Sequence, residues 1–138
     1  MTLYQARRGH DVAIHYHRSA TEAEATAAEA RALGVRAEIF AADLLDLDQT
    51  EALVERAHQA LGPLTVLVNN ASIFEYDNLA SATRSSWDRH MGSNLRAPFV
   101  LTQAFAAQAP RADRSGDEPR AQALVVNMID ERVRKPTP

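Results

Sequence analysis

Short apolar segments alternate with helix-forming segments along the chain, and this alternation constrains the fold more than any other feature of the sequence. The apolar segments lie at residues 12–16, 36–41, 64–68 and 124–128. Segments of this length and character are typical of strands that are buried on both faces. Because strands and helices alternate, we expect an α/β fold with a doubly wound parallel sheet and helices on both of its faces.

The helical segments between these strands carry start and stop signals. Residues 19–22 have the spacing of a capping box, and an alanine-rich helix follows them to a stop at Gly34. Asp48 begins a second segment of the same kind, which stops at Gly62. Two further helical segments are expected: residues 2–8, which end before Gly9, and residues 85–108, in which Pro98 kinks the helix or opens a new turn.

Length, charge and cysteine content limit the classes of protein to consider. The 138 residues fit one domain, 1–138, with a polar surface loop at about residues 111–120. The formal net charge of -3 gives no electrostatic reason to expect a nucleic-acid partner or an acidic membrane partner. The absence of cysteine excludes a disulfide scaffold and a cysteine-ligated metal. No segment has the pattern of a secretory signal or a membrane span, so we expect a cytoplasmic protein.

The residues that follow each strand form the candidate site, because ligands of open α/β sheets bind outside the carboxyl ends of the strands. His17, Arg18 and Ser19 follow the first strand. An acidic residue at this place accepts a hydrogen bond from the ribose of NAD, whereas an arginine accommodates the 2′-phosphate of NADP. The sequence therefore favours NADP if the chain binds a dinucleotide. In the alternative interpretation, Ser19 is only a helix cap and Arg18 is a solvated charge.

Polar residues also follow the other three predicted strands: Asp43, the segment 69–72 and Asp130. Each of them, taken alone, is more typical of a turn than of a site. Four polar strand ends at one edge of a sheet are better evidence for a site. His15 and His17 share one face of the first strand, but no third ligand accompanies them, so we expect no metal.

Three groups of residues resemble motifs of the short-chain dehydrogenase/reductase family. They are Asn69-Asn70-Ala71, similar to the Asn-Asn-Ala-Gly signature after a buried strand; Asp43-Leu44, similar to the segment that contacts the cofactor's adenine; and Asn94, similar to the helix asparagine that supports the proton relay. The resemblance covers residues 3–138 except the polar loop. It implies a Rossmann-like fold and an oxidoreductase.

Residues 16–20, 69–72 and 127–130 narrow the resemblance to the pteridine reductase branch. Ser72 stands where most of the family has glycine, and Asp130 stands where most of it has serine. The branch is NADPH-dependent, which agrees with the inference from Arg18. The resemblance implies that Ser72 and Phe74 line the pterin site, with the Phe74 ring stacked on the pterin. The implied cofactor site consists of His17, Arg18, Ser19, Asp43, Leu44, Asn70, Ala71 and Ser72.

Two features of the family are not found in the sequence: a glycine-rich turn for the pyrophosphate, and a Tyr-x-x-x-Lys pair. The single lysine, Lys135, has Glu131 four residues before it. The resemblance therefore implies truncation at both ends and the loss of a strand that would lie between residues 12–16 and 64–68. Because unpaired buried backbone groups cost about 1–3 kcal/mol each, we expect the chain alone to be inactive, and to be marginally stable, unfolded or paired in another strand order.

The predicted function is NADPH-dependent reduction of a pterin by hydride transfer. Asp130, which orients or relays a proton, and Asn94 are the catalytic residues that the resemblance implies in this chain. The expected partner is a small molecule, and the full-length form is expected to be a homo-oligomer. A reductase of another carbonyl substrate, such as a 3-oxoacyl thioester or a sugar, is the alternative within the class. A non-catalytic truncated chain that only binds a partner is the alternative outside it.

Overall fold

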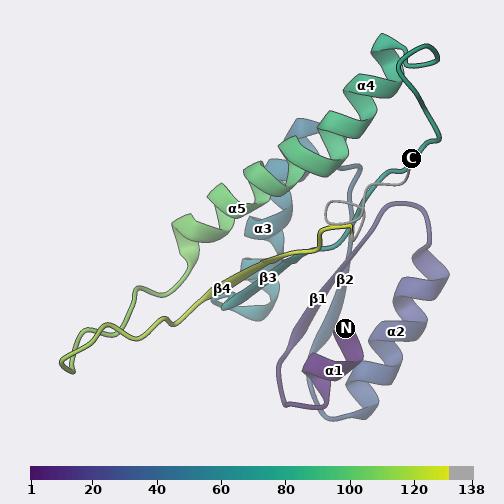
Figure 1. Ribbon diagram of the computed structural model, residues 1–138. Helices are drawn as coiled ribbons and strands as arrows, with labels where there is room; N and C mark the ends of the chain where they lie inside the picture. Colours follow the sequence, from purple (N-terminus) through teal and green to yellow (C-terminus); the bar gives the residue numbers. More distant parts are fainter. Residues whose placement is uncertain (131–138) are drawn as a thin grey trace.

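A computed structural model describes residues 1–130 of the chain, so Lys135 and the end of the predicted domain 1–138 lie outside the described residues. The elements follow the predicted alternation of helices and strands (Figure 1). In chain order they are α1 (Thr2–Ala6), β1 (Val12–Tyr16), α2 (Ala20–Ala32), β2 (Ala37–Ala41), α3 (Leu47–Leu61), β3 (Val66–Asn69), α4 (Arg84–Met91), the π-helix η1 (Gly92–Arg96), α5 (Ala97–Gln108) and β4 (Leu124–Asn127).

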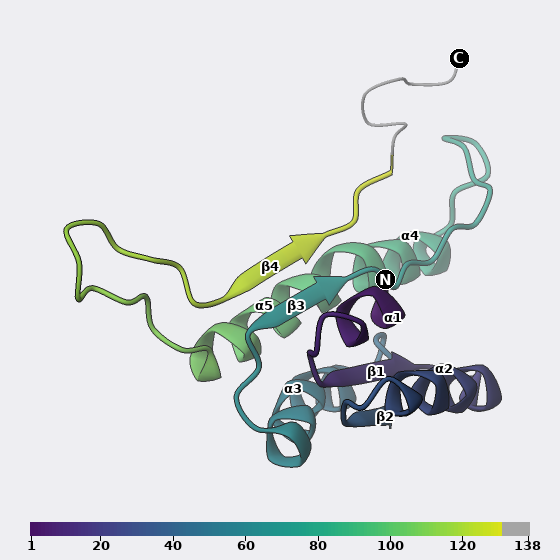
Figure 2. The same ribbon diagram turned by 90° about the horizontal axis from the view of Figure 1, so that it is seen from below.

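The four strands form two parallel pairs. Strand β1 pairs with β2, where Val12 is opposite Ala37, and β3 pairs with β4, where Val66 is opposite Leu124. Figure 2 shows the two pairs side by side, with their strands running in the same direction. All four carboxyl ends therefore lie at one edge, as the prediction of parallel strands requires.

Two apolar cores cover opposite faces of β2, because successive side chains of a strand point to opposite sides. Ala37 belongs to a core with α1 and α2, which includes Ala6 and Ala27. Phe40, three residues further on, belongs to a core with α3 and α5, which includes Leu53 and Phe105. Helices on both faces of parallel strands confirm the doubly wound arrangement.

A cleft of about 850 Å³ separates the two strand pairs. Residues Val12 to His15 of β1 and Val66 to Asn69 of β3 line it, together with Thr2 and Gln5 of α1. No hydrogen-bonded strand joins β1 to β3 among residues 1–130. The gap thus lies where a missing strand was expected, and the strands are not paired in another order. Marginal stability of the chain alone stays a prediction.

Both predicted capping boxes differ in detail from the structure. Ser19 occupies the N-cap position of α2, but its side chain makes no capping hydrogen bond, so the capping box there is wrong. Helix α3 begins at Leu47 with Asp46 as its N-cap, and not with Asp48. The Asp46 carboxylate accepts from the backbone N–H of Gln49 at 3.1 Å and from its side-chain amide at 2.8 Å, which fixes the earlier start.

The predicted helical region 85–108 consists of three consecutive helices. Thr83 caps α4 in a capping box with Ser86, the π-helix η1 follows, and Pro98 lies in the first turn of α5. Pro98 thus opens a new turn, one of the two predicted possibilities, because proline is tolerated in the first turn of a helix. Residues 111–120 are exposed apart from a half-buried Asp113, whose backbone pairs with that of Arg120.

Candidate functional site

The ends of β1 and β2 are joined by two histidine contacts. His15 Nε2 lies 2.9 Å from the carbonyl oxygen of Ala42. His17 Nε2 lies 3.8 Å from Oδ2 of Asp43, and both side chains are about half exposed. The structure therefore brings together two of the predicted cofactor residues, His17 and Asp43, from different strand ends.

Asp43 is held in place by the turn that follows β2. Its Oδ1 accepts the backbone N–H of Leu45 at 2.9 Å, and its own N–H donates to Oε1 of Gln49 at 3.0 Å. Leu44, the next predicted residue, packs against the apolar core under α3 and α5. This leaves Oδ2 of Asp43 directed toward His17.

Arg18 and Ser19 are the two polar residues that directly precede α2. Both residues are exposed, and within residues 1–130 the Arg18 guanidinium makes neither an ion pair nor a hydrogen bond. The Ser19 hydroxyl is not used as a cap, so the first-turn amides of the 13-residue helix α2 receive no side-chain acceptor from it. A free guanidinium, a free hydroxyl and a helix N-terminus together form a place suited to an anion.

Asn69, at the end of β3, is a buried polar residue with an unpaired oxygen. Its side-chain amide donates to Oδ1 of Asn127 at 2.8 Å. Only 9% of Asn69 is exposed, and its buried Oδ1 has no hydrogen-bond partner in the described part of the chain. The sequence analysis counted Asn69 among the polar residues after the strand, in the segment 69–72, but gave a role in the cofactor site only to Asn70, Ala71 and Ser72. An amide that ends an apolar strand was the available signal.

The predicted residues after β3 divide into two groups. Asn70 and Ala71 line the cleft between the strand pairs, together with β1. Ser72 and Phe74 are exposed and lie further along the segment, beyond the residues that line the cleft. Asp130 lies three residues beyond β4, at the same edge of the strands.

Asn94 of η1 is occupied by the segment that carries Ser72 and Phe74. Its Oδ1 accepts the N–H of Ile73 at 2.8 Å, and its Nδ2 donates to the carbonyl oxygen of Ile73 at 2.8 Å. Both polar atoms of the Asn94 side chain thus bind backbone. The Asn94 side chain therefore holds the backbone of this segment through two hydrogen bonds.

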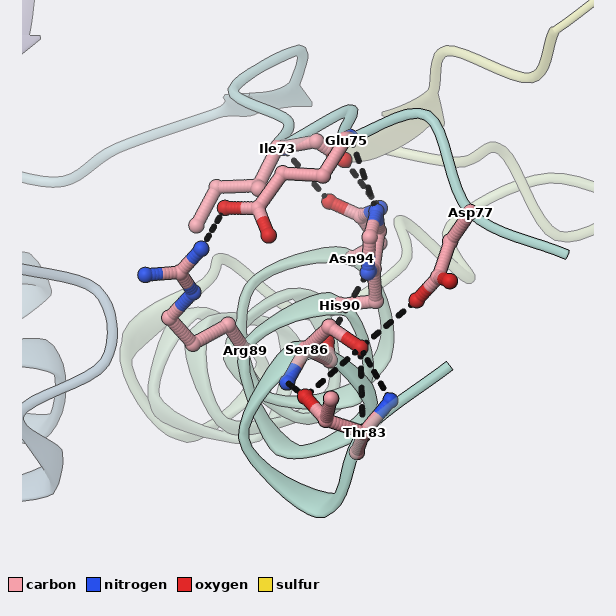
Figure 3. A network of polar contacts seen from close by, with 8 residues as sticks. All are labelled: Ile73, Glu75, Asp77, Thr83, Ser86, Arg89, His90 and Asn94. Atoms are coloured by element: carbon pink, nitrogen blue, oxygen red, sulfur yellow. Dashed lines mark hydrogen bonds and ion pairs between the residues drawn. The ribbon is translucent and has the colours of Figure 1, made fainter. Parts of the chain in front are cut away.

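A network of polar contacts continues along α4 (Figure 3). Glu75 donates its backbone N–H to Nε2 of His90 at 3.0 Å, and its carboxylate pairs with Arg89. Asp77 accepts from the hydroxyl of Ser86 at 2.6 Å. Hydrogen bonds from the Ser81 and Ser86 hydroxyls lower the pKa of Asp77. The sequence prediction missed this network, because no local pattern shows which residues lie beside α4.

A second hollow, of about 1150 Å³, is lined by residues of α4, η1 and α5 and by Leu45, from the turn that follows β2. Within residues 1–130 no three His, Cys, Asp or Glu side chains come together as a metal-binding group. No helix in the same range is both long and apolar enough to cross a membrane. The candidate site is the edge at the carboxyl ends of the strands, where His17 meets Asp43 and where Asn70 and Ala71 line the cleft.

Comparison with known proteins gives matches along most of the chain. The family model of the short chain dehydrogenases matches residues 1–117. A 3-oxoacyl-acyl-carrier-protein reductase, FabG, of Staphylococcus aureus is 34% identical over 116 residues, which are 84% of this chain and 47% of that protein. The chain thus spans about half the length of the curated relatives that it matches.

Solved structures match over a similar or greater share of the chain. FolM alternative dihydrofolate reductase 1 of Brucella canis, complexed with NADP, has a TM-score of 0.83 and 35% identity, over 99% of this chain and 53% of that one. A short chain dehydrogenase of Burkholderia cenocepacia, in complex with NADP, has a TM-score of 0.76 and 38% identity, over 80% and 46%. These matches confirm the predicted Rossmann-like α/β fold.

Proposed function

This chain belongs to the short-chain dehydrogenase family, and from that premise we propose that it forms the cofactor-binding part of an NADPH-dependent oxidoreductase that reduces a pterin. The observation that carries the proposal is the end of β1, where Arg18 is unpaired and Ser19 does not cap its helix. When bound, NADPH would supply the hydride. The chain's own residues would select, hold and orient the reactants.

Arg18 and Ser19 fit the 2′-phosphate that distinguishes NADPH from NADH. A phosphate there would receive the fork of the guanidinium, the hydroxyl and the amides at the start of α2. No acidic side chain occurs among residues 17–19 to repel it or to bind a ribose instead. The alternative, a solvated arginine beside a capping serine, is weakened because the serine makes no cap.

The remaining predicted cofactor residues follow the same edge. Asp43 and Leu44 would hold the adenine, since the turn after β2 fixes the Asp43 backbone and carboxylate. Asn70 and Ala71 would hold the central part of the cofactor at the cleft that they line. His17 would cover the adenine end of the cofactor site through its contact with Asp43.

Phe74 and Ser72 support a pterin as the substrate. Phe74 is 69% exposed and offers a ring face on which a flat heterocycle can stack. The Brucella canis relative is named an alternative dihydrofolate reductase, and dihydrofolate contains a pterin ring. Asp130 would orient or relay a proton at the substrate, and Asn94 would act by fixing the segment that carries Phe74.

A 3-oxoacyl thioester is the second candidate substrate. The Staphylococcus aureus relatives are 3-oxoacyl-acyl-carrier-protein reductases and share 34% of their residues with this chain over the matched part. A thioester carbonyl offers no flat heterocycle to stack on Phe74. Replacing Phe74 with leucine should therefore weaken a pterin far more than a thioester.

One exposed helix face supports a homo-oligomer. Trp87, Met91, Leu95 and Phe99 follow one another at four-residue steps along α4, η1 and α5, and all are exposed. Exposed apolar side chains that form a continuous row usually mark an interaction surface. We propose that a second copy of the chain covers this row.

Titration of the chain with NADPH and with NADH tests the cofactor assignment. We expect NADPH to bind roughly tenfold or more tightly, the effect of one charge-assisted hydrogen-bonded pair. Arg18→Gln should remove that preference, and Arg111→Gln, in the exposed loop, is the matched control. Equal binding of the two cofactors by the unaltered chain, or tighter binding of NADH, would contradict the assignment.

A further inference from the structure

Three side chains follow one another at four-residue steps along α4 and η1. Each of them contacts a different residue of the segment that precedes α4, and the contacted residues lie two positions apart. The contacts are Ser86 to Asp77, His90 to Glu75, and Asn94 to Ile73 (Figure 3). The two segments run in opposite directions. We refer to these three contacts as the ladder.

The ladder has matched steps on its two sides. Four residues of an α-helix, as from Ser86 to His90, rise about 6 Å, and two residues of an extended chain advance about 6.6 Å. Residues 70–78 contain no turn or bend. A straight segment can therefore stay in register with one helix face over all three contacts.

This register sorts the side chains of the segment into two sides. Residues 73, 75 and 77, which meet the helix, are half-buried, whereas residues 72, 74 and 76 are exposed. Tyr76 is 90% exposed. Ser72, Phe74 and Tyr76 thus form one outward side at steps of two residues, as in a strand.

We propose that His90 is a positioning residue that sets the register of residues 72–77 and so turns Ser72, Phe74 and Tyr76 together toward the substrate. This inference rests on the proposed function, because only that function makes the outward side a contact with substrate. His90 is the middle contact of the ladder. Like Asn94, it accepts a backbone N–H of the segment, in this case that of Glu75.

The two hydrogen bonds of His90 indicate which of its ring nitrogens carries the proton. Nε2 accepts the N–H of Glu75, so Nδ1 carries the proton and donates it to the carbonyl oxygen of Ser86 at 2.9 Å. The ring is thereby fixed to its own helix on one side and to the segment on the other. The ion pair between Arg89 and the Glu75 carboxylate also holds Glu75 against the helix.

Amide hydrogen exchange, followed residue by residue by NMR on the full chain, tests the inference without any ligand. In His90→Phe, which keeps a ring but has no acceptor, the N–H of Glu75 should exchange roughly threefold to tenfold faster. His90→Gln, whose amide oxygen can accept, should restore slow exchange. His10→Gln, at an exposed histidine near the N-terminus, is the matched control. The N–H of Ile73, held by Asn94, reports whether the change stays local.

Unchanged exchange at Glu75 in His90→Phe would overturn the inference, as would fast exchange there in the unaltered chain. Failure of His90→Gln to restore slow exchange would also overturn it. Binding of 7,8-dihydrofolate, measured on the same variants, should weaken in His90→Phe and recover in His90→Gln. If the unaltered chain binds no dihydrofolate, the pterin assignment fails, and the exchange data still decide the role of His90 in setting the register.

Discussion

Asn69 and Asn127, 58 residues apart in the sequence, join the last residues of β3 and β4 through their side chains. The side-chain amide of Asn69 donates to Oδ1 of Asn127 at 2.8 Å, and the two residues are also the last pair in the register of the strands. Asn69 is buried and its own Oδ1 is already unpaired. Its amide therefore depends largely on Asn127, because the other contact, to Thr102, is long at 3.4 Å.

Replacing Asn127 with alanine should lower the free energy of unfolding by about 1–3 kcal/mol, since it leaves a buried donor without a good partner. Urea denaturation followed by circular dichroism measures this change. Asn70→Ala, at an exposed residue next to the same strand, is the control and should change stability little. Equal effects of the two substitutions would show that the contact adds nothing to stability.

Acid should destabilise the chain through aspartates whose pKa values are lowered in the folded state. Hydrogen bonds from the backbone and side chain of Arg36 lower the pKa of Asp11, and those from Gln49 lower the pKa of Asp46. A lowered folded pKa contributes stability above the unfolded value, and this contribution is lost as the pH falls through the folded value.

The free energy of unfolding should therefore decrease as the pH falls below about 4, the ordinary range of aspartate. In Asp11→Asn this decrease should be smaller. Asp117→Asn, in the exposed loop, should keep the full decrease and serves as the control. Denaturant curves at several pH values measure it. A steeper decrease in Asp11→Asn than in the unaltered chain would contradict the assignment.

The core under α3 and α5 should tolerate loss of volume poorly. Leu101 is 7% exposed and packs in that core with Leu53 and Phe105. Leu101→Ala should cost about 2–5 kcal/mol of stability, because it removes buried methyl groups and leaves a cavity. Leu79, which is fully exposed, offers the matched control Leu79→Ala. Thermal unfolding compares the two, and a similar melting temperature for both would be inconsistent with this core.

The exposed row on α4, η1 and α5 predicts self-association. Leu95 is 59% exposed in the middle of this row, and Leu95→Glu would place a charge in the proposed contact. We expect sedimentation velocity to show a dimer or larger species for the unaltered chain and a monomer for Leu95→Glu. Leu79→Glu, which lies away from the row, should behave like the unaltered chain. A monomeric unaltered chain at high concentration would argue against the oligomer.

The elements of this fold follow from local features of the sequence, whereas their exact starts do not. Strand positions come from apolar runs that need two covered faces, which is why residues 12–16 match β1. The start of α3 was placed two residues late, because Asp46 with Gln49 and Asp48 with Glu51 both have the spacing of a capping box. Only the folded chain, in which Gln49 also binds the N–H of Asp43, decides between them.

The candidate site was predictable where it lies at strand ends and not where it depends on long-range contacts. His17 and Asp43 were placed in the site because each follows a strand, and the structure brings them together. Predicting the contact of His90 with Glu75 would have required knowledge that residues 73–77 lie beside α4 and η1. Neither His90 nor Glu75 lies in a local sequence pattern that indicates the other as its partner.

The outward side of residues 72–77 makes Tyr76 a further candidate contact for a flat substrate. Its ring follows that of Phe74 by two residues on the same side and is 90% exposed. Tyr76→Ala should weaken binding of 7,8-dihydrofolate several-fold, the usual effect of one aromatic contact of about 0.5–1.5 kcal/mol, while Tyr76→Phe should keep it. Equilibrium dialysis with NADPH present measures the affinity. Leu79→Ala, beyond the ladder, should leave it unchanged, and an equal loss in that variant would mean that Tyr76 makes no specific contact.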